Sequence, residues 1–391
     1  MKISHFLVLS VLVPVCSGCV YPFEPKGVDE KKFILVVEGD IIANGTTVIQ
    51  ISRSFGIDET IADMALERNA LVVVESSTGV VYPATETTPG IYEADTDNID
   101  LSARYRLCIS TRDNIAYASE YVPVCISPPV DSVSYLVNEA EQCVNIYVST
   151  HDPGNKTHFY RWTFEQDWEF HSVYTAVIYF DVTTGTYQYF TDDWYSPYTF
   201  CWNRHNSSGI YVDNSIKFTQ DRIDNKPIVS INASDQRISY LYCIRVIQRA
   251  LTVDGYEYWS NLNKYGEDLG GIFAPMPNEL RGNIRCLSDP DQPVLGFVSA
   301  TTCTYSDRTF IDDPFNDQNR TVFMACDNEV VVSGSVPPGL LSAHMTFLLS
   351  TKLPYMETTS PGSAYWAPRR CVDCTMHGTK NKPSWWPNDH H

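Results

Sequence analysis

The sequence predicts a mainly β protein, and three observations carry this prediction. Short segments rich in Val, Ile, Thr and Tyr recur along the chain between turn residues. Helical periodicity is confined to one stretch, residues 253–269. Of 12 cysteines, Cys16 and Cys19 lie in the N-terminal segment, which leaves ten, an even number that indicates disulfides in an exported protein. We expect tandem β-sandwiches, one short helix and a loop-rich, disulfide-bonded C-terminal region.

The first residues have the composition of an export signal. Lys2 precedes an apolar run over residues 6–15, which suits a signal peptide and is too short to span a bilayer. The segment Cys16-Ser-Gly-Cys19 that follows has the shape of a bacterial lipobox, although Leu is usual where Cys16 stands. We expect a signal peptide over residues 1–18, lipidation of Cys19 and a tether over residues 19–32. The alternative is ordinary secretion, with Cys19 as a disulfide cysteine.

The composition also restricts the class of partner. A formal net charge of -19 argues against nucleic acid, because phosphate binding requires a basic surface. The same charge disfavours anionic lipid headgroups. No later segment offers roughly 18 uninterrupted apolar residues, so we expect the lipid to be the only membrane anchor.

The first predicted domain, residues 33–126, contains about seven short strands at the spacing that is typical of a β-sandwich. Asn44-Gly45 lies between two apolar runs and predicts a hairpin. Strands are expected at residues 33–39, 41–42, 47–52, 71–75, 80–83, 90–93, 105–110 and 117–122.

A second β-sandwich, immunoglobulin- or fibronectin-like, is expected over residues 130–250. Pro128-Pro129 marks its start, since neither proline donates to a sheet, and Thr183-Thr-Gly185 predicts a hairpin tip. Aromatic residues between Trp162 and Trp202 are expected to fill the core as cross-strand pairs, with carbohydrate or peptide binding as the alternative. Strands are expected at residues 144–150, 159–165, 176–181, 187–190, 228–231 and 241–248.

The region 251–391 is expected to pack on the second domain. Its helix over residues 253–269 should end at Gly270-Gly271. Strands are expected at residues 293–300, 330–333 and 343–349.

A search for catalytic chemistry finds no local signature of a hydrolase, metalloprotease or nucleotide-binding enzyme, and we predict no catalytic residue, metal or cofactor. Asp95 to Asp100 is interpreted as an acidic turn. Cys371-Val-Asp-Cys374, with His377, favours two disulfides that reach back into the body of the chain, ahead of a redox pair and of a zinc site.

Connectivity cannot be deduced from cysteine spacing, although Cys108 and Cys125 flank a hairpin-like stretch and are candidates for local pairing. Asp131-Ser132-Val133 resembles an acceptor motif for O-glycosylation in Bacteroidota envelope proteins. The disulfide candidates are Cys108, Cys125, Cys143, Cys201, Cys243, Cys286, Cys303, Cys326, Cys371 and Cys374.

A series of short motifs, in order along the chain, resembles the Bacteroidota lipoprotein family catalogued as domain of unknown function 4249. The motifs are Cys19-Val-Tyr-Pro22, Leu35-Val-Val-Glu-Gly39, Ile51-Ser-Arg-Ser54, Gly270-Gly-Ile-Phe273, Gly282-Asn-Ile284, Val294-Leu-Gly-Phe297, Cys371-Val-Asp-Cys374 with Gly378, Asn381-Lys-Pro383 and Trp385-Trp-Pro387. The cysteine count exceeds what the family leads us to expect.

The resemblance implies an outer-membrane lipoprotein, on the cell surface or the periplasmic face, whose first domain is transthyretin- or carboxypeptidase-regulatory-like. It also implies a gene that lies beside that of a TonB-dependent receptor. Our leading hypothesis is an accessory binding or scaffolding role with that receptor, and the candidate ligands are a small molecule, a peptide or a glycan. We expect exposed aromatics of the second domain and the loop from Gly270 to Ile284 to form the contact surface. The alternatives are an envelope enzyme acting on glycans or peptides, and a surface adhesin or structural protein.

Overall fold

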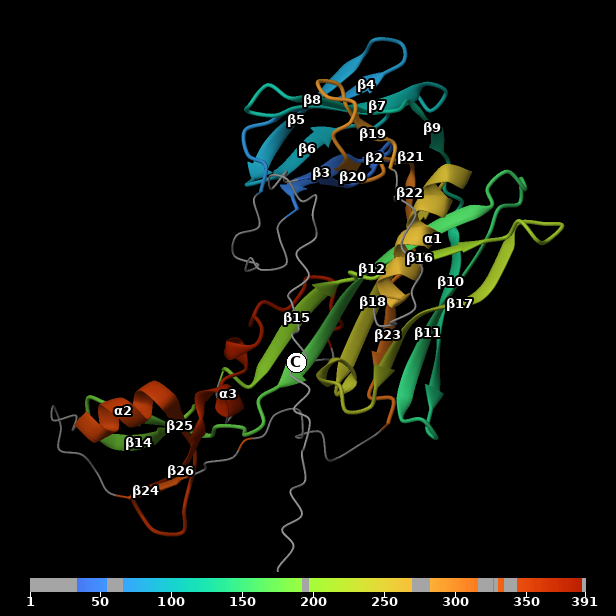
Figure 1. Cartoon of the computed structure of the whole chain (residues 1–391). Helices are drawn as coiled ribbons and strands as arrows, with labels where there is room; N and C mark the ends of the chain where they lie inside the picture. The colour runs from blue at the N-terminus through green and yellow to red at the C-terminus, as the bar shows by residue number, and fades with distance from the viewer. Residues whose placement is uncertain are drawn as a thin grey trace, which may run out of the picture.

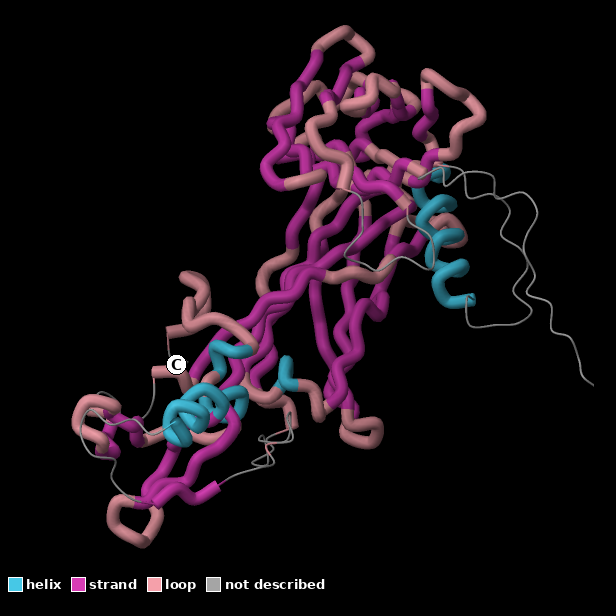
Figure 2. Tube along the Cα trace, turned by 60° about the vertical axis from the view of Figure 1, so that its left-hand side comes forward, coloured by secondary structure: helices cyan, strands magenta, loops and turns pink. Residues whose placement is uncertain are grey.

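The structure is a computed structural model, and it describes residues 34–54, 66–191, 197–268, 282–315, 326, 330–333 and 343–388. Three units follow one another in space (Figure 1), and the same row is visible after rotation (Figure 2). The protein is mainly β, as the sequence predicts, whereas the particular sandwich types stay predictions. Within the described part, no helix is long and apolar enough to cross a membrane.

The N-terminal unit is a curled sheet around a core that includes Leu35, Ile51, Val72 and Tyr105. Its strand order is β2-β21-β9-β7-β4-β5-β6-β3-β1-β20, with β8 beside β7 and β19 beside β8. The strands are β1 (Leu35–Glu38), β2 (Ile41–Ile42), β3 (Thr46–Arg53), β4 (Leu71–Ser76), β5 (Val81–Thr88), β6 (Ile91–Asp95), β7 (Arg104–Ser110), β8 (Ala116–Ser119), β9 (Val122–Cys125), β19 (Ile284–Cys286), β20 (Val294–Leu295) and β21 (Ala300–Thr301).

Three of these strands come from far along the chain. β19 pairs with β8, β20 lies parallel to β1, and β21 lies parallel to both β2 and β9. A turn forms at Asn44-Gly45, but β2 pairs with β21 rather than with β3, so the predicted hairpin is wrong. The reason is a competing partner, because the Asn44 side chain accepts from the Cys303 amide at 2.9 Å and donates to the Cys303 carbonyl at 3.0 Å.

The central unit consists of a three-stranded sheet, β10-β11-β17, and a six-stranded sheet built around β12 and β18. Trp162, Phe164 and Phe170 are buried in the core, which agrees with the prediction for the aromatics between Trp162 and Trp202. The predicted helix is confirmed as α1 (Val253–Asp268). The other elements are β10 (Val130–Asn138), β11 (Cys143–His151), β12 (Phe159–His171), β15 (Phe200–Asn206), β16 (Tyr211–Asn214), β17 (Arg222–Asn232), η2 (Gln236–Ile238), β18 (Leu241–Ala250), β22 (Cys303–Tyr305) and β23 (Thr309–Asp312).

The C-terminal unit combines a hairpin from the middle of the chain with the elements that follow residue 329. Gly185 occupies the hairpin tip at φ 69°, as predicted. Residues 343–349, expected to be a strand, instead belong to a helix, because they are rich in Ala, Met and Leu and bury Met345 and Leu348 on one face. The elements are β13 (Ile178–Asp181), β14 (Thr186–Tyr189), β24 (Val330–Ser333), α2 (Ala343–Thr351), β25 (Lys352–Glu357), β26 (Ser363–Pro368), α3 (Arg369–Val372) and η3 (Cys374–Met376). The described residues thus contain three α-helices rather than one.

A buried ion cluster joins the N-terminal and central units. The Asp40 carboxylate receives the Arg161 guanidinium at 2.5 Å and lies 3.6 Å from Nε of Arg249. The Arg161 guanidinium faces the Trp259 ring, 4.2 Å from its centroid. Desolvation lowers the pKa of Arg161 and the Asp40 carboxylate opposes that shift. The Asp40 carboxylate of the N-terminal unit is therefore the shared counter-charge of two buried guanidinium groups of the central unit.

The proline pair between the two units is held by hydrogen bonds. The Pro128 carbonyl accepts from Gln248 and from Thr304, both at 2.8 Å, and the Pro129 carbonyl accepts from Thr150 at 3.2 Å. These bonds fix the direction in which the chain enters β10.

Replacement of Asp40 by Asn should destabilise the protein by about 3 kcal/mol, because two guanidinium groups then lack their shared counter-charge. Urea unfolding monitored by tryptophan fluorescence measures the loss. The control is Asp224→Asn, which breaks the exposed Arg222–Asp224 pair and should change the unfolding midpoint little. Equal midpoints for the two variants contradict a structural role for the ion cluster.

Candidate functional site

Two disulfides hold the C-terminal unit. Cys201 in β15 bonds to Cys374, and Cys326 bonds to Cys371, with Cα–Cα distances of 5.8 and 6.0 Å. The prediction that Cys371 and Cys374 each bond to the body of the chain is confirmed. The first bridge joins residues 173 positions apart, so it closes a long loop across the boundary between the central and C-terminal units.

The remaining candidates are free thiols, so their assignment as disulfide cysteines is wrong in this structure. They lie on six different strands, and Cys108 does not pair with Cys125. β7 and β9 are antiparallel, and Arg104 of β7 is opposite Pro123 of β9. Each cysteine follows its reference residue along its own strand, so Cys108 and Cys125 lie toward opposite ends of the ladder. The free thiols are Cys108, Cys125, Cys143, Cys243, Cys286 and Cys303.

The structure also locates, or leaves undescribed, the other residues that the sequence analysis singled out. Cys19 and residues 270–281 of the expected contact loop lie outside the described residues, so predictions that depend on them are unchanged. Ser132 is exposed on β10, where the ladder with β11 is irregular. Asp95 and Asp100 accept hydrogen bonds from backbone amides two residues on, as expected of an acidic turn. The described segments hold no group of three or more acidic, His or Cys side chains that suits a metal ion.

A buried carboxylate organises the loop between β16 and β17. Asp221 is 2% exposed and accepts hydrogen bonds from the Tyr160 hydroxyl, the Ser215 hydroxyl and, at 2.6 Å, the Asp152 amide. The Asp221 amide donates to the Asn155 side chain at 2.6 Å. Burial, followed by the neighbouring Asp221, raises the pKa of Tyr160, so its phenol stays protonated and donates. These bonds tie the loop to the body of the sheet.

The neighbouring His158 gives this cluster the composition of a hydrolase triad but not its geometry. Nδ1 of His158 lies 3.0 Å from the Ser215 hydroxyl and 4.0 Å from Asp221, so a single ring nitrogen faces both groups. A triad needs one ring nitrogen for the nucleophile and the other for the acid. Ser215 is fully buried and donates directly to Asp221. The cluster is therefore a structural anchor.

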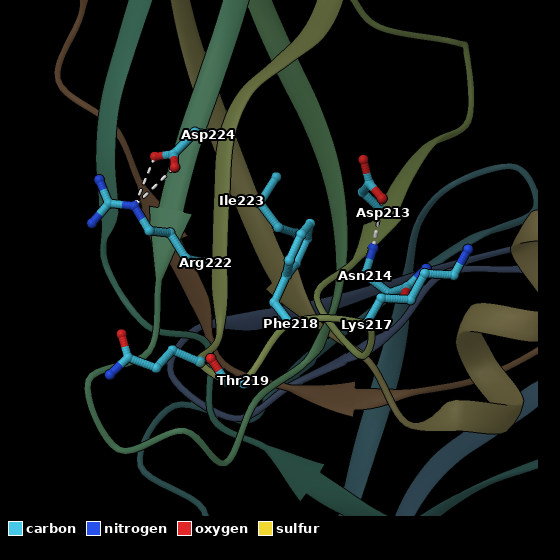
Figure 3. A pocket seen from close by; sticks show the side chains of 9 residues that line it. Asp213, Asn214, Lys217, Phe218, Thr219, Arg222, Ile223 and Asp224 are labelled. Atoms are coloured by element: carbon cyan, nitrogen blue, oxygen red, sulfur yellow. Dashed lines mark hydrogen bonds and ion pairs between the residues drawn. The ribbon is translucent and has the colours of Figure 1, made fainter.

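An open pocket of about 610 Å³ lies beside this anchored loop. Figure 3 shows Phe218 and Ile223 between the Arg222–Asp224 pair and the group formed by Asp213, Asn214 and Lys217. The nine lining residues are Asp213, Asn214, Lys217, Phe218, Thr219, Gln220, Arg222, Ile223 and Asp224. We name this feature the loop pocket.

Most polar side chains of the loop pocket are held by partners. Nε of Arg222 lies 2.9 Å from Asp224, and Asp213 lies 3.1 Å from Nζ of Lys226. The amide of Asn214 donates to the Tyr256 hydroxyl of α1 at 2.7 Å. The pocket therefore offers oriented donors and acceptors around an apolar centre, which is the composition of a binding site.

A second, smaller pocket of about 270 Å³ lies in the C-terminal unit. Its walls are mainly apolar and aromatic, including Tyr179, Phe190 and Leu353, and its charged groups are Arg369 and Asp373. These two groups lie 3.8 Å apart and face each other. The charged groups of this pocket are therefore already paired.

The fold and the loop pocket define a mainly β, disulfide-bonded protein with an open pocket. The family model described as domain of unknown function (DUF4249) matches residues 20–306, and the chain belongs to this family. The predicted family is thus confirmed, whereas the motifs from Cys371 to Pro387 lie outside the matched residues. A search of curated proteins gave no match. The matched region contains the loop pocket and the ion cluster and ends before β23.

Sequence reasoning missed the loop pocket. The sequence feature that could have indicated it is Ile216-Lys-Phe218, in which two large apolar residues lie within a polar segment. Both are more than 60% exposed in the structure, at 61% and 64%. Exposed apolar residues on an ordered loop favour binding, but their exposure is known only once the fold is known.

Thiol titration of the unfolded, non-reduced chain from Val20 onward should count the six free thiols named above and no others. Reduction should add the four sulfurs of Cys201, Cys326, Cys371 and Cys374. Mass spectrometry of alkylated peptides identifies which cysteines react. Fewer reactive thiols before reduction indicate bridges other than the two in the structure.

Native alkylation of Cys125 should be slow and should rise with pH. Burial raises the pKa of this thiol to about 11 from an ordinary value near 9, so the thiolate fraction at pH 8 is lower by about 100-fold than in the unfolded chain. The rate at this position, followed by mass spectrometry from pH 7 to pH 10, measures the effect. Equal rates in the folded and urea-unfolded protein contradict it.

Proposed function

We propose that this protein is an outer-membrane lipoprotein that acts as an accessory binding or scaffolding partner of a TonB-dependent transporter. The lipobox-like segment ending at Cys19 supports the anchor. Membership in the DUF4249 family is compatible with this role. The geometry of the described residues favours binding, because the loop pocket is open and its polar groups are oriented in advance.

The observation that carries the proposal is the fixed junction between the N-terminal and central units. The tether enters the N-terminal unit, whereas the loop pocket lies in the central unit. The Asp40 ion cluster and the bonded proline pair hold the two units together. An anchored scaffold with a rigid joint presents its site at a defined place relative to the membrane, and confinement to the membrane raises its effective concentration at a partner.

The anchor is tested on the mature protein in membranes. We expect mass spectrometry to find an N-terminal Cys19 that carries acyl chains, and the protein in the membrane fraction. Cys19→Ala should leave the leader uncleaved or the protein unlipidated. Cys143→Ala is the matched control, because that free thiol lies far along the chain in β11 and its loss should not affect processing. An unacylated wild-type N-terminus overturns the proposed anchor.

The partner is tested by mild detergent extraction and affinity capture of the lipidated wild-type protein. We expect a TonB-dependent β-barrel to co-purify and to be the main cross-linked species. Capture should fall strongly for Cys19→Ala, because the partner then meets the protein only from solution. Recovery of no outer-membrane barrel with the wild type removes the proposed partnership.

A further inference from the structure

We propose that the loop pocket binds a neutral oligosaccharide, with one sugar ring stacked on Phe218. This inference rests on the proposed binding role and adds the chemical class of the ligand. It is argued from the exposure of Phe218, the rigidity of its loop and the charge of the pocket.

Phe218 is an apolar ring that folding leaves in water. Its exposed fraction is 64%, and it is not a member of the central hydrophobic core. Covering such a ring removes apolar surface from water and so stabilises a complex. The C–H face of a pyranose ring is flat and apolar, which suits stacking on a single exposed phenyl group.

The loop that carries Phe218 is fixed before any ligand arrives. Its first residue, Ser215, is fully buried, and its amide donates to the His158 carbonyl at 2.9 Å. Its last residue, Asp221, is held by four hydrogen bonds in the anchor described above. Between them, the Phe218 amide closes a turn on the Ser215 carbonyl at 2.9 Å. Because both ends are fixed, little conformational entropy is lost on binding.

The carboxylates that line the loop pocket are both paired with cations. Asp224 pairs with Arg222, Asp213 pairs with Lys226 just outside the lining, and Lys217 adds a further cation. Asn214 and Gln220 add amide groups, and Thr219 adds a hydroxyl. Sugar hydroxyls both donate and accept, so they match this mixture of fixed donors and acceptors.

Other ligand classes fit this lining less well. An anionic glycan or phosphate is disfavoured by the net charge of -19 of the protein as a whole. An extended peptide binds mainly by pairing its backbone with a free sheet edge, and although β17 is such an edge, that pairing would not by itself use the exposed Phe218 ring. A neutral polyhydroxylated ligand uses all the groups that are present.

The experiment uses the full mature chain and a panel of defined probes. Neutral gluco-, manno- and xylo-oligosaccharides are compared with oligogalacturonate and with short peptides by isothermal titration calorimetry. We expect at least one neutral oligosaccharide to bind, with little dependence on salt, and Phe218→Ala to weaken that binding by about tenfold or more. Binding only to oligogalacturonate or to peptides overturns the proposal, as does the absence of binding to every probe.

A matched variant on the same loop separates stacking from folding. Ile216 is 61% exposed, two residues from Phe218, and does not line the pocket. Ile216→Ala should keep the wild-type affinity, and both variants should keep the wild-type unfolding midpoint. Equal affinities for the wild type and Phe218→Ala place the sugar elsewhere and refute the assignment. If the wild type binds the sugar but captures no transporter, only the proposed partnership is rejected. The failure of the partnership is therefore distinguishable from the failure of the sugar assignment.

Discussion

One carboxylate shared by two guanidinium groups determines how the first two units of this molecule meet. Asp40 is almost completely buried, and removing its carboxylate from water costs free energy. The attraction between this carboxylate and the guanidinium groups of Arg161 and Arg249 offsets that cost. The Trp259 ring faces the first of these cations and adds a favourable contact. Because the groups come from β12, β18, α1 and the turn after β1, the cluster forms only when all these elements are in place. The relative placement of β1, where the described chain begins, and the loop pocket depends on it.

At the other end of the molecule, covalent bonds have the corresponding role. Cys201–Cys374 ties the last segment of the chain to β15, and Thr379 continues the contact by exchanging backbone hydrogen bonds with Trp202 at 2.8 Å. Trp386 is then buried with Leu241 and Cys243 on the outer face of the central sheet. The tail therefore seals a surface that β18 would otherwise present to water. This region lies beyond the matched family segment, so the candidate site does not depend on it directly.

Features set by a few neighbouring residues were predictable from the sequence, whereas pairings between distant segments were not. The hairpin tip at Gly185, the helix α1 and the bonding of Cys371 and Cys374 follow from turn geometry, periodicity and redox chemistry within a few residues. The pairing of β2 with β21 depends on Asn44 meeting Cys303, which no local pattern shows. Helix α2 was missed because a short apolar run fits either structure until its buried face is known. The loop pocket was missed for a similar reason, because the exposure of Phe218 is known only from the fold.

The late strands β19 to β21 have a consequence for how the molecule matures. A chain that emerges from its N-terminus first cannot complete the first sheet until residues 284–301 are also present. Until then β2 lacks a paired strand, and β1 and β8 each have one paired neighbour and one open edge. Contacts across such separations form slowly, so these open edges persist until residues 284–301 are in place.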